Sequence, residues 1–239
     1  MTLILRSAIL NDVGLVRTNN EDSALAGDRL VAVADGMGGL PAGEVASEIV
    51  IRILDELTPP TVPDEAADAL RAVVSTANQR IRAAITVDPA RDGMGTTLTA
   101  ALLAGDTLVL AQVGDSRCYL LRDGELTQLT RDDTFVQALV DQGALAPDQA
   151  RHHPQRSLVT RAVQGSDAPP AIGVLTVFPG DRLLLCSDGL SDYVEDPAIA
   201  AALGTYGDRQ QCGEQLVKLA HQAGAPDNVT VVVSDVADA

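Results

Sequence analysis

Four aspartates stand at the ends of apolar runs in this chain: Asp35, Asp115, Asp188 and Asp227. An isolated carboxylate loses its hydration at the end of a buried strand, so each of these sites needs a compensating partner. Backbone amides of a tight turn are one candidate, and a shared divalent cation is the other. A single Asp-Gly indicates a turn, because that pair is common in turns for conformational reasons alone. Recurrence at four strand ends favours the cation.

The ligand types at these positions indicate which cation it is. Carboxylate oxygens with few histidines form the ligand set of hard cations such as Mg²⁺ or Mn²⁺. The histidines are His152, His153 and His221, with no HExxH and no Cys/His pairing, which excludes a typical zinc site. The glycine-rich 36–39 segment lacks the GxGxxG spacing, and it is typical of a loop whose backbone comes close to an ion or a phosphate.

A second polar group lies upstream, where Arg17 precedes Glu21 and Asp22. One interpretation is a surface ion pair. The other is an anion clamp beside a metal-binding carboxylate, because a guanidinium binds phosphate bidentately. The residues alone leave both interpretations open.

Composition excludes several functional classes. The 239 residues include 33 acidic and 17 basic side chains, giving a net charge of −16, so phosphate repulsion would oppose nucleic-acid binding. Three dispersed cysteines, Cys118, Cys186 and Cys212, without a CxxC, favour a reducing cytoplasmic compartment. The first ten residues lack a secretory pattern, and no apolar run reaches the roughly 18 residues of a membrane helix. We therefore expect a soluble intracellular protein.

Hydrophobic periodicity predicts the elements that must position these residues. The expected order of strands, two long helices, a strand meander and a mixed end differs from a regular βαβ alternation. A mostly antiparallel sheet system covered by helices fits better, with no linker that would divide it. Strands are expected at 3–10, in a hairpin over 23–34, and at 98–104, 108–113, 117–122, 125–129, 183–186 and 229–233. Helices are expected at 43–57, from an N-cap at Asp64 to 85, and at 135–142, 147–152 and 208–221.

Seven motifs follow one another across nearly the whole chain. They are Arg17-Thr-Asn-Asn-Glu21-Asp22, Val33-Ala-Asp35-Gly36-Met-Gly38-Gly39 with Gly43-Glu44, Gly95-Thr96-Thr97, Val113-Gly114-Asp115-Ser116-Arg117, His153-Pro-Gln-Arg156 with Thr160-Arg161-Ala162, Leu185-Cys-Ser-Asp188-Gly189-Leu-Ser-Asp192, and Pro226-Asp227-Asn228-Val-Thr230. Together they closely resemble the metal-dependent Ser/Thr protein phosphatases of type 2C (the PPM family), in particular its compact bacterial members. Any one motif is weak, whereas seven in family order are specific.

The resemblance implies an α+β fold, a four-layer αββα sandwich with two stacked, mostly antiparallel sheets flanked by helices. It also implies a single phosphatase domain over residues 1–239, with a flap-like segment around 132–160.

The resemblance further implies a centre of two Mn²⁺ or Mg²⁺ ions at one edge of the sandwich. Asp35 would bridge the ions. Asp188 and Asp227 would hold one of them, and Glu21 with the carbonyl of Gly36 would hold the other. The implied mechanism is attack on phosphorus by water that the two cations activate.

Bacterial relatives often bind a third ion, and Asp115 with Asp188 matches its ligands, with Asp192 contributing through water. Arg17 matches the phosphate-binding arginine of the family. Asp22 resembles the carboxylate that orders water beside the ions. The catalytic residues implied are thus Arg17, Asp22 and Asp35.

Two positions depart from the family pattern. Met37 stands where animal relatives have a histidine that is often assigned as general acid, although bacterial relatives commonly have methionine there. Asp133 stands where many bacterial relatives have the histidine of Asp-His-Ser/Thr, which leaves the contacts of the flap open.

The implied function is hydrolysis of phosphoserine and phosphothreonine in proteins, opposing a bacterial Ser/Thr kinase, by a cytoplasmic monomer with no nucleic-acid or membrane partner. The alternative is a catalytically silent phosphoprotein-binding regulatory module of the same fold. A third hypothesis, a phosphatase dedicated to anti-sigma-factor antagonists, is less favoured because those proteins usually carry sensor domains.

Overall fold

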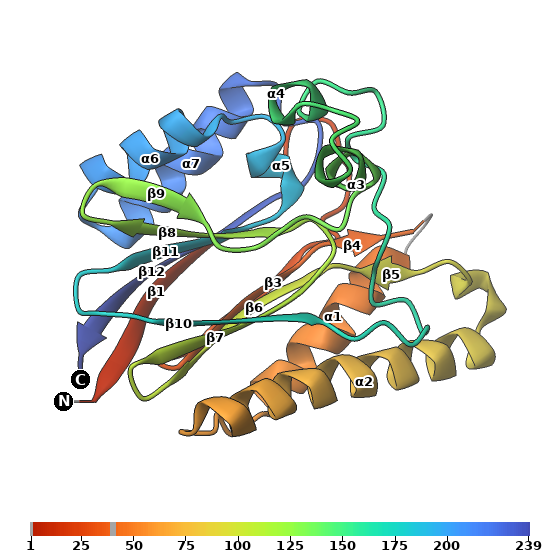
Figure 1. The fold of residues 1–239 in the computed structure, drawn as a ribbon. Coiled ribbons are helices and arrows are strands. Elements are labelled where there is room, and N and C mark those ends of the chain that lie inside the picture. The colour runs from red at the N-terminus through yellow and green to blue at the C-terminus, as the bar shows by residue number, and fades with distance from the viewer. Residues whose placement is uncertain (1, 39–41) are drawn as a thin grey trace.

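Two five-stranded antiparallel sheets are stacked in the computed structural model, which describes residues 2–38 and 42–239 (Figure 1). The first sheet has the order β1 (Leu3–Asp12), β12 (Val229–Asp238), β11 (Arg182–Cys186), β8 (Arg117–Arg122) and β9 (Glu125–Gln128). The second has the order β10 (Ala171–Thr176), β7 (Thr107–Val113), β6 (Leu98–Ala104), β3 (Leu30–Ala34) and β2 (Ser23–Ala26). The short strands β4 (Gly36–Met37) and β5 (Gly95–Thr96) pair separately.

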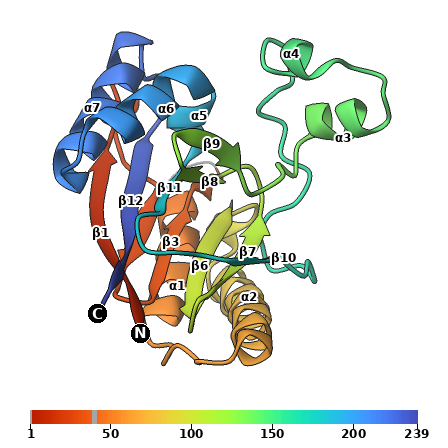
Figure 2. The ribbon, with the colours of Figure 1, turned by 60° about the vertical axis from the view of Figure 1, so that its left-hand side comes forward.

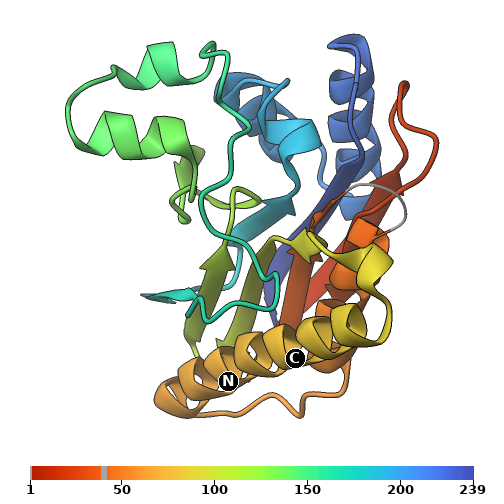
Figure 3. The ribbon, with the colours of Figure 1, turned by 90° about the vertical axis from the view of Figure 1, so that its right-hand side faces the viewer.

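Helices cover the outer face of each sheet (Figures 1 and 3). The long helices α1 (Ala42–Asp55) and α2 (Pro63–Val87) pack on the second sheet, and α6 (Asp196–Thr205) and α7 (Arg209–Gln222) pack on the first. The short helix α5 (Asp188–Ser191) follows β11, and a 3₁₀ turn occupies Pro89–Arg91. The helices α3 (Phe135–Asp141) and α4 (Pro147–Ala150) stand beside the sandwich, as Figure 2 shows. The predicted four-layer αββα architecture is confirmed.

The buried strands are apolar on both faces because each sheet lies between two cores. Along β3, Val31 and Val33 belong to the core between the sheets, whereas Leu30 and Ala32 belong to the core under α1 and α2. Alternate side chains of a strand point to opposite faces, so a continuous apolar run serves both cores. A third core lies between the first sheet and α5, α6 and α7.

Several boundaries differ from those predicted. The second long helix begins at Pro63 with Val62 as N-cap, so Asp64 lies in the first turn and the predicted N-cap is wrong. A proline is well suited to that first position because its missing N–H would be unpaired there anyway. The strands β1 and β12 extend to Asp12 and Asp238, because the two pair along their whole length.

The predicted site aspartates meet at one edge of the sandwich. Asp35 follows β3, Asp115 follows β7 after one glycine, Asp188 begins α5 directly beyond β11, and Asp227 precedes β12. Antiparallel pairing thus brings four distant segments to one place. Across residues 2–38 and 42–239, none of the helices has the length and apolar character that crossing a membrane requires.

Candidate metal centre

A cavity of about 420 Å³ opens at this edge of the sandwich. It is lined by seven of the nine predicted site residues, namely Arg17, Glu21, Asp35, Gly36, Asp115, Asp188 and Asp227. The other two lie close by: Asp22 is buried next to Glu21, and Asp192 lines a neighbouring cavity of about 270 Å³. The two cavities share Asp115. The structure therefore brings together residues that are far apart in the sequence.

Two threonines fix the backbone of Asp35. The N–H of Asp35 donates to Thr97 Oγ1 at 2.9 Å, and its carbonyl accepts from Thr97 N at 2.8 Å and from Thr96 Oγ1 at 2.9 Å. Thr97 Oγ1 also lies 2.7 Å from Ser116 Oγ, beside Asp115. The Gly95-Thr96-Thr97 motif therefore holds Asp35 in place at the end of β3.

Gly36 lies where a side chain cannot fit. A Cβ added there would lie 2.4 Å from the carbonyl oxygen of Gly43 and 2.5 Å from that of Glu21. The N–H of Gly36 donates to the Glu21 carbonyl at 3.2 Å. Close backbone approach is the usual reason for such a glycine, and here it places the Gly36 peptide beside Glu21 and Asp35.

Asp22 is a buried carboxyl group with one oxygen free. Its Oδ2 accepts from Ser187 Oγ at 2.8 Å, whereas its buried Oδ1 has no hydrogen-bond partner among the described residues. Burial raises the pKa of Asp22 to about 6, and the hydrogen bond from Ser187 partly opposes that rise. A buried oxygen of this kind needs a water or cation partner.

The carboxylates of the cavity repel one another. Burial raises the pKa of Asp35 and of Asp188 well above the usual range, and repulsion by neighbouring aspartates raises both further. Burial, followed by repulsion from Asp132 and Asp192, raises the pKa of Asp115 to about 7. Within residues 2–38 and 42–239, Asp35, Asp115 and Asp188 take part in no ion pair. A set of clustered, unpaired carboxylates suits a divalent cation.

Arg17 reaches across the cavity entrance to Asp227. Its Nη2 donates to Asp227 Oδ2 at 2.8 Å, and both side chains are partly exposed. In the part of the chain that the structure describes, no three acidic, histidine or cysteine side chains converge closely enough to surround one ion. The two oxygens of Asp227 accept from Arg17 Nη2 and from the N–H of Asn228.

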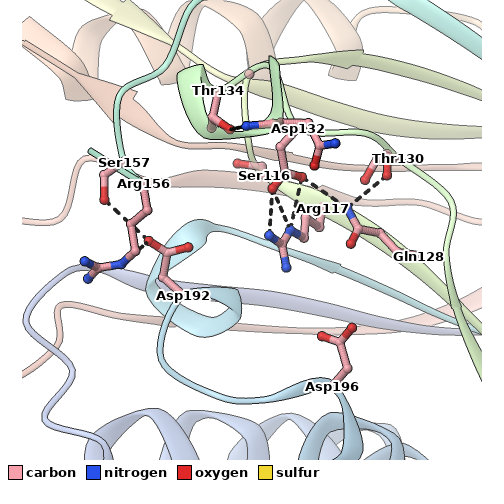
Figure 4. Close-up of polar contacts among 12 residues, drawn as sticks. Ser116, Arg117, Gln128, Thr130, Asp132, Thr134, Arg156, Ser157, Asp192 and Asp196 are labelled. Carbon is pink, nitrogen blue, oxygen red and sulfur yellow. Dashed lines mark hydrogen bonds and ion pairs between the residues drawn. The ribbon is translucent and has the colours of Figure 1, made fainter. Parts of the chain in front are cut away.

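Asp192 contacts the segment that carries α3 and α4 (Figure 4). Its Oδ2 lies 3.3 Å from Arg156 Nε and accepts from Ser157 Oγ at 3.4 Å. On the opposite wall of the smaller cavity, Arg117 binds both oxygens of Asp132 at 2.6–3.0 Å. Asp115 and Asp192 line this smaller cavity together with the Arg117–Asp132 pair.

Asp133 ties both ends of the segment 134–159 to the site. Its Oδ2 accepts from Gly114 N at 3.1 Å, and its Oδ1 lies 3.4 Å from Arg161 Nη1. Its carbonyl accepts from Thr160 N at 2.7 Å and from Thr160 Oγ1 at 2.9 Å. Asp133, which stands where many bacterial relatives have histidine, therefore anchors the segment 134–159 and is not part of the cavity lining.

Sequence reasoning missed the cavity wall that this segment supplies, namely Ser157, Leu158 and Val159. Nothing in their types or spacing points to the cavity. Met37 does line it, as its place beside Asp35 suggested, and its thioether has no proton to donate. Gly39, at the end of the glycine-rich motif, lies outside the described residues.

The cysteines take no part in the site. Cys118, Cys186 and Cys212 are buried free thiols. Burial raises the pKa of Cys186 to about 12 and that of Cys118 still further, so neither is a thiolate near neutral pH.

A sequence profile described as Protein phosphatase 2C matches residues 17–220. The chain belongs to the protein phosphatase 2C family. The match runs from Arg17 through the segments that supply Glu21, Asp35, Asp115 and Asp188.

Curated members of the protein phosphatase 2C family are similar to this chain along its length. It is 52% identical over 238 residues to the Serine/threonine protein phosphatase PstP of Mycobacterium tuberculosis, covering 100% of this chain but 46% of PstP. It is 35% identical over 235 residues to the Protein phosphatase PhpP of Streptococcus pneumoniae, covering 95% of each chain. The chain thus spans about half the length of PstP and nearly all of PhpP.

Solved structures of this family agree with the fold. The catalytic domain of PstP in complex with two manganese ions superposes with a TM-score of 0.92 at 50% identity, covering 99% of this chain and 100% of that one. The predicted family and fold are therefore confirmed.

Proposed function

We propose that this chain hydrolyses phosphoserine and phosphothreonine in proteins with the help of bound Mn²⁺ or Mg²⁺ ions. The observation that carries the proposal is the cavity at the sandwich edge, where unpaired carboxylates from separate segments face one guanidinium. The PstP domain that binds two manganese ions has the same fold, which supports a similar centre here.

Five residues would hold the two core ions. Glu21, Asp35 and the Gly36 carbonyl would hold one, and Asp35, Asp188 and Asp227 the other. All five line the same cavity. Bound cations of this kind stabilise phosphoryl oxygens and lower the pKa of water.

The remaining residues would act on the substrate and on a third ion. Arg17 would leave Asp227 and bind the equatorial oxygens of the phosphoryl group, since a guanidinium can pair with two of them. Asp22 would order a water through its free Oδ1 while Ser187 holds its other oxygen. Asp115 and Asp188 would bind a third ion, with Asp192 contributing through water.

We further propose that residues 1–239 form one phosphatase domain and that the segment 132–160 is its flap. The family match over residues 17–220 supports the first part. The pairing of Thr134 with Val159 at the base of α3 and α4 supports the second.

The cellular setting belongs to the same proposal: a cytoplasmic signalling enzyme, monomeric, that opposes a Ser/Thr protein kinase. Three buried free thiols are typical of a reducing compartment. Light scattering of the purified protein would determine its oligomeric state.

The test is hydrolysis of p-nitrophenyl phosphate and of phosphothreonine peptides with Mn²⁺, Mg²⁺ or excess chelator. We expect activity to need metal and to vanish with chelator. Asp35→Asn should lower the rate by at least about 100-fold, because Asp35 is placed to share both ions.

The exposed substitution Asp68→Asn on α2 is the charge-matched control and should behave as the wild type. Removal of a repelled carboxylate should leave metal-free Asp35→Asn at least as stable as the wild type at neutral pH. Normal turnover by folded Asp35→Asn would contradict the metal assignment. A folded wild type that is inactive with every metal would favour the silent binding module.

A further inference from the structure

Asn228 lies between Asp227 and the start of β12, and its side chain is 5% exposed. Its amide makes three hydrogen bonds within the described residues. Oδ1 accepts from Glu21 N at 2.9 Å, and Nδ2 donates to the carbonyls of Val13 at 3.0 Å and Asn19 at 2.9 Å. One amide group thus contacts both ends of the loop 13–21.

That loop carries Arg17 and Glu21, and it contains no strand or helix. Its backbone therefore lacks the ladder of hydrogen bonds that fixes the neighbouring strands. One backbone bond links it to the segment before β12, from Leu15 N to the Ala225 carbonyl at 2.8 Å. The Asn228 amide supplies three more contacts and acts in place of a strand partner.

The backbone of Asn228 also lies against the segment that supplies Asp188. A Cβ added at Gly189 would lie 1.9 Å from the Asn228 carbonyl oxygen, so only glycine permits this approach. On the other side, the N–H of Asn228 donates to Asp227 Oδ1 at 2.9 Å. Asn228 therefore touches three segments that carry predicted ligands.

We propose that Asn228 is a positioning residue that sets the spacing between the two predicted ion positions, by holding the Glu21 loop against Asp188 and Asp227. The proposal rests on the function proposed above. It assigns to Asn228 a role in the geometry of the centre without contact to substrate or ions.

The side-chain chemistry explains why an amide is needed. The position uses one acceptor and two donors, which an asparagine side chain supplies and an aspartate does not. Alanine would leave Glu21 N and two carbonyls without partners, and such groups are costly when they are shielded from water. The loop would then shift, and Glu21 would move relative to Asp188.

The effect should fall unequally on the two ions. The ion expected at Glu21, Asp35 and Gly36 depends on the loop, whereas Asp188 and Asp227 lie on segments that the sheet holds. We therefore expect Asn228→Ala to weaken one Mn²⁺ site by about 10- to 100-fold and to leave the other within a few-fold, the range typical of residues that orient metal ligands. Asn228→Asp keeps the acceptor for Glu21 N but turns a carboxylate oxygen towards the carbonyls of Val13 and Asn19, so its loss should be at least as large as that of the alanine variant.

Two measurements on the 239-residue chain test this. Calorimetric titration with Mn²⁺ gives the number and affinity of the sites. Electron paramagnetic resonance of the Mn²⁺-loaded protein reports coupling between neighbouring ions, which depends on their separation. The control is Asn78→Ala, because Asn78 is equally buried and its Oδ1 accepts from Gly165 N at 2.9 Å, outside the cavity lining.

The expected result is selective loss of one site and of the coupled signal in the Asn228 variants, with both retained in Asn78→Ala at a comparable loss of thermal stability. Normal binding and coupling in folded Asn228→Ala would overturn this inference and leave the proposed function standing. Equal weakening of both sites in Asn228→Ala and Asn78→Ala would also overturn it, because it would indicate general destabilisation. A wild type that binds no Mn²⁺ would overturn both proposals.

Discussion

Arg17 and Asp227 pair across 210 positions of sequence, at 2.8 Å. The guanidinium and the carboxylate of this ion pair are both partly exposed to water. The pair therefore contributes little to the free energy of unfolding, about 0–1 kcal/mol. If Asp227 holds a cation as proposed, Arg17 competes with that cation for the same carboxylate. Both interpretations of Arg17 drawn from the sequence can thus hold: it forms an ion pair without metal and remains placed to bind an anion.

Replacement of Arg17 should separate substrate binding from metal binding. For Arg17→Ala we expect KM for phosphopeptides to rise at least about 10-fold, because a charged hydrogen-bond donor to phosphate is lost. We expect Mn²⁺ affinity to stay constant or to rise a few-fold, because Asp227 loses its competing partner. Steady-state kinetics and calorimetric titration measure the two effects. A large loss of Mn²⁺ affinity would show instead that Arg17 organises the ligands.

The sequence motifs single out nine candidate site residues, and the structure places eight of them in the lining of two adjoining cavities, with Asp22 buried next to Glu21. Their contacts could not be predicted. Nothing in the pattern shows that Asp227 faces Arg17, or that the Asn228 amide binds a loop more than 200 residues away. Such contacts depend on how loops cross after the strands have paired, and periodicity contains no information on that.

At the scale of elements, Asp133 holds the segment with α3 and α4 against the sandwich. It accepts hydrogen bonds from Gly114 and Thr160 and forms an ion pair with Arg161. Because Gly114 immediately precedes Asp115, the anchor of the flap and a predicted ligand of the third ion share one turn. We therefore expect a change at the Asp133 anchor to be felt at Asp115.

Removal of the Asp133 carboxylate should loosen the flap. We expect trypsin to cut Asp133→Ala at Arg151 and Arg156 several-fold faster than the wild type, because local opening exposes these sites more often. Asp133→Asn keeps an acceptor for Gly114 N and loses the charge pair with Arg161. Its rate of cleavage should therefore lie between those of the wild type and of Asp133→Ala. Mass spectrometry of timed digests identifies the cuts, and equal rates for all three proteins would rule out the anchor.

Most elements could be predicted, and the exceptions have physical reasons. The strands at 98–104 and 117–122 were predicted with their observed bounds, because turns of the Gly-Asp and Asp-Gly type delimit them. The helix α6 was missed because four of its ten residues are alanine and its two larger apolar residues give little contrast between faces. The strand β10 was missed because it is a partly exposed edge strand interrupted by Gly173.

At the scale of the molecule, the clustered carboxylates oppose folding when no metal is bound. The pKa of Asp22 is raised to about 6 and that of Asp115 to about 7, so the folded chain holds protons that the unfolded chain releases above pH 4. A carboxyl group with a raised pKa stabilises the folded state while it is protonated, and this stabilisation is lost as the pH rises through the raised pKa. The net charge of −16 acts in the same direction.

Metal-free protein should therefore be more stable at pH 5.5 than at pH 7.5, by several degrees in Tm. Thermal unfolding in excess chelator at the two pH values measures this, and Mn²⁺ at pH 7.5 should restore the lost stability. In Asp115→Asn the Tm difference between the two pH values should be smaller. This would show that the effect comes from the carboxyl groups of the site as well as from the net charge of the chain. An equal or higher Tm at pH 7.5 in chelator would be incompatible with the clustered carboxylates described here.

The strands β1 and β12 pair from Leu3 with Asp238 to Asp12 with Val229, so the two ends of the described chain lie side by side (Figure 1). The Asn228 contacts and Asp227 belong to a segment synthesised about 200 residues after Arg17 and Glu21. During translation, the early residues leave the ribosome long before their partners exist. This edge of the sandwich can close only after β12 has cleared the exit tunnel, so a nascent chain that stops before Asp227 carries most of the motifs without the assembled cavity.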